Sequence, residues 1–169
     1  VCPGGFGTQD ELFEALTLIQ TGKSNVVPIV LLEGSGGVYW EHWRTYILKN
    51  LLDNGWISPE DMSLIHMAKT PEDACRHILD FYRVYHSCRY VGDHLVLRLQ
   101  CELPAERIEQ LNDEFADLVQ SGRFEQAGAL PAEQDHLEMQ RIVFHHTRRA
   151  WGRVRQLIDR INEFGAESS

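Results

Sequence analysis

The chain lacks the features that mark two large classes of protein. Its 169 residues include 16 Lys or Arg against 25 Asp or Glu, so its formal net charge at pH 7 is −9. Proteins that bind nucleic acid over a broad surface usually have a basic balance or a dominant basic face, so this composition argues against that class. No uninterrupted apolar run approaches the roughly 18 residues with which a helix crosses a bilayer, and no membrane partner is expected.

Cysteine, histidine and lysine are present, but not in the sequence patterns that indicate paired cysteines, a metal site or a Schiff-base lysine. The four cysteines show no Cys-x-x-Cys spacing, and we expect them to be reduced and partly buried in a cytoplasmic protein: Cys2, Cys75, Cys88 and Cys101. The eight histidines include no His-Glu-x-x-His motif, so no metal site is predicted. Pyridoxal phosphate enzymes need a Schiff-base lysine, and none of the three lysines has an obviously buried setting: Lys23, Lys49 and Lys69. No cofactor is expected.

A glycine-rich turn opens directly into an amphipathic helix at the start of the chain. Gly4, Gly5 and Gly7 allow backbone angles closed to other residues and let a ligand approach the main chain. The free N–H groups of the first helical turn point at whatever lies there, and a phosphate is the natural ligand. The pattern therefore predicts an anion site.

Glu11 has two interpretations. Thr8 and Glu11 are spaced as in a capping box, in which the threonine hydroxyl accepts from the Glu11 amide and the glutamate reaches back to the Thr8 N–H. Alternatively, Glu11 lies at the edge of the phosphate site, where the helix dipole helps to keep it ionised. The two interpretations can apply in different ligand states.

Residues 1–86 show the alternation of helix and strand that is typical of a doubly wound sheet. Apolar periodicity and turn residues predict a helix, a buried parallel strand, a glycine-rich loop, a helix, a strand and a helix over residues 8–21, 26–32, 34–37, 39–54, 63–67 and 70–85. We expect the second half of a Rossmann-like α/β domain, with its ligand at the carboxyl ends of the strands. Aromatic residues within it favour core packing over a stacked base or a dimer surface: Trp40, Trp43, Tyr46 and Trp56.

Residues 87–169 are predicted to form an α+β extension. A strand is expected over residues 90–99, a helix over 105–120 and a long helix over 135–164. The long helix would carry six arginines and two histidines: Arg141, Arg148, Arg149, Arg153, Arg155, Arg160, His145 and His146. A solvated face paired with acidic neighbours is favoured for these residues, with a phosphate or effector site as the alternative.

The segment Pro3–Glu11 matches the Pro-Gly-Gly-x-Gly-Thr-x-x-Glu signature, and through it the chain resembles the Lonely Guy family of nucleotide phosphoribohydrolases. The similarity continues through residues 12–23, 30–32 and 54–58 and covers about the first eighty residues. The remainder is similar to the extension of longer bacterial members, which are often labelled possible lysine decarboxylases or Rossmann-fold proteins.

The resemblance implies hydrolysis of the bond between base and ribose in a nucleoside 5′-monophosphate, which yields free base and ribose 5-phosphate. It also implies that Glu11 is the catalytic carboxylate, and that the 5′-phosphate is held by four residues: Gly4, Gly5, Gly7 and Thr8. Neither a metal nor a redox cofactor is implied, and relatives of this kind form homodimers.

The family also uses an upstream arginine and an earlier glycine-rich turn, and no segment of this chain matches them. We therefore expect the chain to be the C-terminal portion of an enzyme and to be inactive alone. One rival hypothesis is a nucleotide or molybdenum-cofactor carrier that binds without catalysis. Another is a regulatory scaffold that senses nucleotides through the arginine-rich helix.

Overall fold

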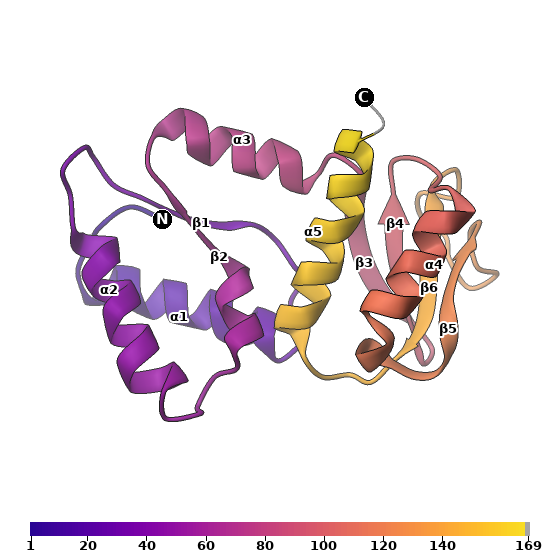
Figure 1. The fold of residues 1–169 in the computed structure, drawn as a ribbon, viewed down its shortest axis with the longest axis horizontal. Coiled ribbons are helices and arrows are strands. Elements are labelled where there is room, and N and C mark those ends of the chain that lie inside the picture. The colour runs from indigo at the N-terminus through magenta and orange to yellow at the C-terminus, as the bar shows by residue number, and fades with distance from the viewer. Residues whose placement is uncertain (168–169) are drawn as a thin grey trace. The chain divides into compact units, whose positions relative to one another are not determined.

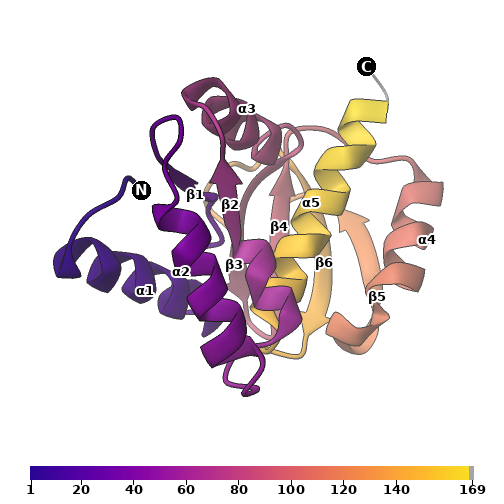
Figure 2. The same cartoon turned by 60° about the vertical axis from the view of Figure 1, so that its left-hand side comes forward.

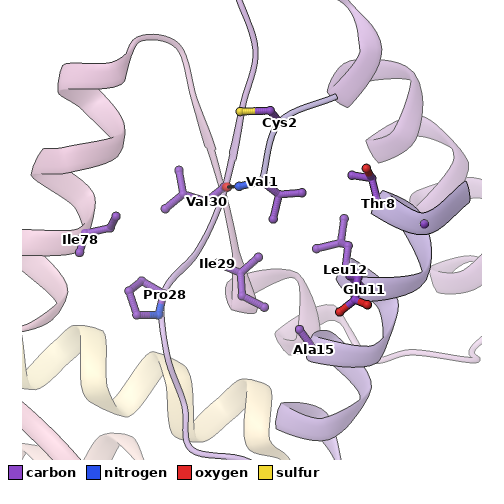
Figure 3. A pocket seen from close by; sticks show the side chains of 11 residues that line it. Val1, Cys2, Thr8, Glu11, Leu12, Ala15, Pro28, Ile29, Val30 and Ile78 are labelled. Carbon is purple, nitrogen blue, oxygen red and sulfur yellow. Dashed lines mark hydrogen bonds between the residues drawn. The ribbon is translucent and has the colours of Figure 1, made fainter. Parts of the chain in front are cut away.

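A short parallel sheet with helices on both faces forms the N-terminal part of the protein. In the computed structural model, which describes residues 1–167, β1 (Ile29–Leu32) pairs in parallel with β2 (Ile65–Ala68). Helices α1 (Phe6–Gln20) and α3 (Pro71–Phe81) lie on opposite sides of β1 (Figure 1), with Ile29 toward α1 and Val30 toward α3 (Figure 3). The apolar run of β1 is buried because helices cover both of its sides, as its composition predicted.

Val1 forms a one-residue parallel pairing with β1. Its nitrogen donates to the Val30 carbonyl at 2.7 Å, and its carbonyl accepts from the Leu32 N–H at 2.9 Å. This alternation of donor and acceptor is the pattern of a parallel ladder. The Gly-rich turn therefore starts from a position fixed at the edge of β1.

The remaining elements of this part follow the predicted order, with shorter bounds. Helix α2 (Tyr39–Ile47) is continued by a π-helical turn, η1 (Leu48–Leu52), and a 3-10 helix, η2 (Pro59–Leu64), precedes β2. Helix α3 ends at Phe81, four residues before the predicted end of that helix.

The predicted stop after the first helix is confirmed. Gly22 has φ +69°, and the N–H groups of Gly22 and Lys23 donate to the carbonyls of Ile19 and Leu18. These are the two bonds of a Schellman motif, which needs a left-handed residue at this position. A side chain there would also meet the Trp151 ring, since an added Cβ would lie 2.3 Å from its Nε1.

A four-stranded antiparallel sheet forms the second part. Its order is β3 (Tyr85–Val91), β4 (His94–Leu99), β6 (Gln140–His146) and β5 (Val119–Ala127). Helix α4 (Ala105–Glu114) and the greater part of α5 (Trp151–Glu167) cover one face of it (Figure 2). The predicted α/β class is therefore confirmed as a mixed fold with one parallel and one antiparallel sheet.

The chain divides into two units on its internal contacts. The first contains residues 1–80 and 151–155, and the second contains the other described residues, 81–150 and 156–167. Among the described residues, no helix is long and apolar enough to cross a membrane. The four cysteines are free thiols, of which Cys88 is buried and the other three are exposed.

The predicted single strand over residues 90–99 is wrong. The chain reverses at Gly92 and Asp93, so that β3 and β4 form a hairpin in which Val91 is paired with His94. Gly92 has φ +60°, and a two-residue reversal of this kind requires the left-handed region that glycine adopts at no steric cost.

The predicted helix over residues 105–120 is also wrong in its second half. Helix α4 stops at Glu114, a 3-10 turn (η3, Ala116–Leu118) follows, and β5 then runs back along the sheet. The side chain of Asn112 accepts from the Phe124 N–H at 2.8 Å and donates to the Phe124 carbonyl at 3.2 Å. The helix and the returning strand are thereby joined by one amide side chain.

The long helix predicted over residues 135–164 does not exist. Residues 140–146 form β6, and α5 begins only at Trp151. Arg148 and Ala150 have φ values of 60° and 55°, which interrupt any continuous helix. The eight basic and histidine residues therefore lie on a strand, a linker and a helix. The continuous arginine-rich helix that the hypothesis of a nucleotide-sensing scaffold required is absent from the described residues.

Candidate functional site

The glycine-rich turn leads into α1 two residues earlier than the sequence predicted. The N-cap is Gly5, and it makes no side-chain capping bond. Thr8 therefore lies within the first turn of α1, and the predicted capping box between Thr8 and Glu11 is wrong. The first N–H groups of α1 are left without intrahelical partners, which is the condition for binding an anion there.

The three glycines of the turn have different surroundings. An added Cβ on Gly4 would lie 2.0 Å from Thr8 Oγ1, so this position has no room for a side chain. An added Cβ on Gly5 or Gly7 would meet no other atom within 4 Å. None of the three has a positive φ, so the predicted need for unusual backbone angles is not met here. At Gly5 and Gly7 the absence of a side chain leaves the main chain open to approach.

An open cavity of about 660 Å³ lies between α1 and β1. Its lining includes Gly7, residues of β1, Cys2 and Ile78. Thr8 and Glu11 line it on the helix side (Figure 3). Thr8, Glu11 and Ala15 share this face because they are three and four positions apart in a helix. Glu11 is exposed, so its carboxylate is open to a ligand.

Of the five residues predicted for the site, three therefore line one cavity. Gly4 and Gly5 are not among its lining residues and lie just before the helix. Its lining includes two polar side chains, Thr8 and Glu11, and the other side chains are mostly apolar. A negative ligand group at this place would depend on the N-terminus of α1.

Tyr39 is the contact of the glycine-rich turn that the sequence analysis missed. Its hydroxyl donates to the Gly4 carbonyl at 2.5 Å and accepts from the Gln9 amide at 2.5 Å. Its backbone N–H donates to Glu33 Oε2 at 3.0 Å. A signal was available, since Tyr39 follows the glycine-rich loop at the carboxyl end of a predicted strand, where ligands bind in open α/β sheets.

Two histidines stack elsewhere in the first unit. The His66 and His77 ring centroids are 3.9 Å apart with 6° between the planes, and Arg155 Nη2 lies 3.1 Å from His77 Nε2. Burial, followed by the charges of His66 and Arg155, lowers the pKa of His77 to about 4. His77 is therefore neutral at physiological pH.

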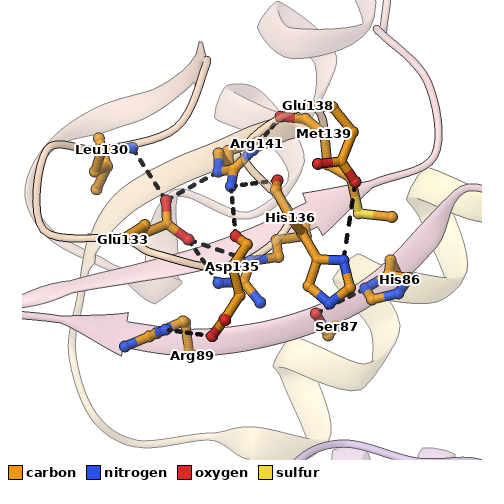
Figure 4. Close-up of polar contacts among 11 residues, drawn as sticks. His86, Ser87, Arg89, Leu130, Glu133, Asp135, His136, Glu138, Met139 and Arg141 are labelled. Carbon is orange, nitrogen blue, oxygen red and sulfur yellow. Dashed lines mark hydrogen bonds and ion pairs between the residues drawn. The ribbon is translucent and has the colours of Figure 1, made fainter.

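A buried carboxylate, Glu133, joins Arg98 and Arg141 in the second unit, and Figure 4 shows its contacts with Arg141 and Leu130. Glu133 Oε1 accepts from Arg98 Nη2 at 2.8 Å, and Glu133 Oε2 accepts from Arg141 Nε at 2.9 Å and from the Leu130 N–H at 3.1 Å. Burial by itself would raise the pKa of Glu133, but the hydrogen bonds from Arg141, Leu130 and Arg98 outweigh it and lower the pKa to about 2.

This cluster fixes the loop between β5 and β6 against the sheet. Arg98 and Arg141 are paired across β4 and β6, and two like charges in that position repel each other. Glu133 resolves the repulsion, and Arg141 also donates to backbone carbonyls of the same loop, at His136 (2.8 Å) and at Met139. Every group named is satisfied within the protein, so the cluster is structural.

Comparison with known proteins separates the same two regions. The sequence model of a family described as "Possible lysine decarboxylase" matches residues 1–78. The cytokinin riboside 5′-monophosphate phosphoribohydrolase of Mycobacterium tuberculosis is 38% identical over 76 residues, which are 45% of this chain and 38% of that protein. Both findings support the resemblance of residues 1–78 to the Lonely Guy family. The chain spans about two fifths of the length of this relative, and the antiparallel sheet lies outside the family match.

Proposed function

We propose that the protein containing this chain hydrolyses the N-glycosidic bond of a nucleoside 5′-monophosphate to free base and ribose 5-phosphate. The observation that carries the proposal is the position of Glu11, an exposed carboxylate on the wall of an open cavity, one helical turn beyond an uncapped helix N-terminus. The similarity to a phosphoribohydrolase over 76 residues supports the same reaction.

The reaction needs a negative group beside the sugar. Cleavage of the ribosyl C–N bond builds positive charge on the ribose ring, as glycoside hydrolysis does in its oxocarbenium-like transition state. A fixed carboxylate stabilises that charge, and it can also orient or deprotonate the attacking water. In this proposal Glu11 is the catalytic residue.

The 5′-phosphate would lie at the start of α1. Gly4, Gly5, Gly7 and Thr8 would hold it through backbone N–H groups and the threonine hydroxyl. The open space around Gly5 and Gly7 supports this placement, since a ligand oxygen can approach their main chain without displacing a side chain.

We also propose the second half of a Rossmann-like sheet, a homodimer and a cytoplasmic location for this protein. The parallel pairing of β1 and β2 and the ladder bonds of Val1 support the first of these. A decarboxylase that uses pyridoxal phosphate is not supported by the described residues, because Lys23, Lys49 and Lys69 are all exposed and a Schiff-base lysine needs a buried setting.

The test is to incubate the intact protein with a panel of purine and pyrimidine 5′-monophosphates and to measure ribose 5-phosphate. We expect release from at least one of them, and a fall of about a hundredfold or more in kcat for Glu11→Gln with nucleotide binding retained. Glu14→Gln is the matched control, because Glu14 is exposed on the same helix and does not line the cavity.

Two results would contradict the proposal. Near-normal turnover by Glu11→Gln would remove the catalytic role of that carboxylate. Tight binding of a monophosphate without any base release by the intact wild-type protein would favour the non-catalytic carrier instead.

A further inference from the structure

The hydroxyl of Tyr39 joins three segments that meet at the proposed phosphate site. It donates to the carbonyl of Gly4 in the glycine-rich turn and accepts from the side chain of Gln9 in α1, and Tyr39 itself is the first residue of α2. The bond to Gly4 links residues 35 positions apart.

A trans peptide is planar, so its C=O and the following N–H point in opposite directions. The bond from the Tyr39 hydroxyl to the Gly4 carbonyl therefore also sets the direction of the Gly5 N–H. It also engages a carbonyl oxygen whose partial negative charge would otherwise be free to turn toward an anion. The other side of Gly4 is closed by the Thr8 side chain, which leaves the peptide little freedom.

Contacts with Glu33 and Trp40 hold Tyr39 in place. Glu33, directly after β1, accepts from the backbone N–H of Tyr39 at 3.0 Å and from that of Trp40 at 3.4 Å. A carboxylate at this place also favours the N-terminus of α2 electrostatically. The Tyr39 ring lies edge-on to the buried Trp40 ring, with 4.7 Å between centroids.

We propose that Tyr39 is a positioning residue for phosphate recognition: its hydroxyl orients the Gly4–Gly5 peptide so that the turn presents N–H groups to the 5′-phosphate. This inference rests on the proposed function. It assigns to Tyr39 an effect on ligand affinity through the phosphate, and no direct part in bond cleavage.

The experiment compares Tyr39→Phe with the wild type in two assays. Calorimetric titration with ribose 5-phosphate measures binding without any turnover, and steady-state kinetics on a hydrolysed monophosphate separates KM from kcat. We expect the Kd and the KM to rise about three- to tenfold, the effect of one lost hydrogen bond, with kcat changed less than about twofold. Tyr46→Phe is the control, since Tyr46 is exposed on the same helix.

A second variant separates positioning from a general loss of structure. Gln9→Leu leaves the bond to Gly4 and removes the other partner of the hydroxyl, so we expect a smaller rise in the Kd for ribose 5-phosphate. In the double variant the loss should not exceed that of Tyr39→Phe alone, because both act through one hydroxyl. Because the bond to Gly4 remains in Gln9→Leu, a rise of about tenfold or more in its Kd would assign the effect to the contact with α1 and overturn the inference, whether or not Tyr39→Phe folds.

The outcomes distinguish this inference from the proposed function. An unchanged Kd in folded Tyr39→Phe, or a fall in kcat with an unchanged KM, overturns the positioning role even where the wild type hydrolyses nucleotides. If the wild type binds ribose 5-phosphate but hydrolyses no monophosphate, the catalytic proposal fails and the binding assay still tests Tyr39.

Discussion

The polar clusters described in the two units differ in their exposure to solvent. In the first, the glycine-rich turn and Glu11 face open space, and one tyrosine hydroxyl holds the turn. In the second, Glu133, Arg98 and Arg141 are buried and satisfy one another. Charge that is left accessible can act on a ligand, whereas charge that is buried and paired can only fix the chain. The contrast supports the proposed site in the first unit.

Removing the buried carboxylate should produce the largest loss of stability. Glu133→Gln keeps the shape of the side chain but leaves Arg98 and Arg141 buried without a counter-charge, and we expect the second unit to lose about 3–5 kcal/mol. Hydrogen exchange of the β4 and β6 amides measures this loss. Exchange at wild-type rates would show that the arginines find other partners and that the contrast between the units is false.

The matched control for this change is Glu109→Gln. Glu109 pairs with Arg123 on the surface, where both side chains are more than half exposed. Exposed pairs contribute little because water and salt screen them, so we expect no measurable change in the same experiment.

Removal of a neutral buried side chain in the second unit should cause the next largest loss of stability. Asn162 accepts from the backbone N–H groups of Val84 and Tyr85 at 2.8 and 3.0 Å, and it donates to the Phe81 carbonyl at 2.7 Å. Asn162→Ala leaves these buried groups unpaired and should cost about 2–3 kcal/mol, seen as faster exchange at the start of β3. Asn54→Ala, at an exposed site, should leave that exchange unchanged.

The smallest predicted effect is a change in the stability of the first unit with pH. Because the pKa of His77 is lowered to about 4 from an ordinary value of 6.5, the unfolded chain binds a proton between these values and the folded chain does not. Stability should therefore fall by about 1–2 kcal/mol as the pH drops from 6.5 to 4. Arg155 and His66 oppose the charged form of His77, while Asp73 and Asp80 favour it.

His77→Gln should flatten that pH dependence. Tryptophan fluorescence during urea unfolding reports on the correct unit, since all four tryptophans belong to it: Trp40, Trp43, Trp56 and Trp151. An undiminished slope between pH 6.5 and 4 in the variant would assign the effect to other groups.

The first unit could be predicted well because its signals are local. The apolar spacing in α1, the buried run of β1 and the left-handed glycine at position 22 each depend on neighbouring residues. The start of α1 was misplaced because Gly5, rather than Thr8, is the N-cap. The motif marks Gly7, Thr8 and Glu11. Tyr39 contacts Gly4 from 35 residues away, outside the motif, and its place after the glycine-rich loop was the one available signal.

The second unit was predicted poorly for a physical reason. Strand β6 contains a fully buried arginine, Arg141, which breaks the alternation of apolar and polar residues by which strands are recognised. That burial depends on Glu133, in a loop whose position only the folded sheet sets. The left-handed backbone at Arg148 and Ala150 is equally hidden, because residues other than glycine rarely adopt it.

The anchoring of both ends of the segment between β1 and α2 constrains its length. Glu33 binds the start of α2, and the phenol of Tyr39 reaches back to Gly4, so residues 34–38 must span a fixed distance. One residue inserted or deleted there would carry the phenol away from its acceptor while leaving both flanking elements intact. Natural variation in this family should therefore tolerate changes of residue type in the segment more readily than changes in its residue count.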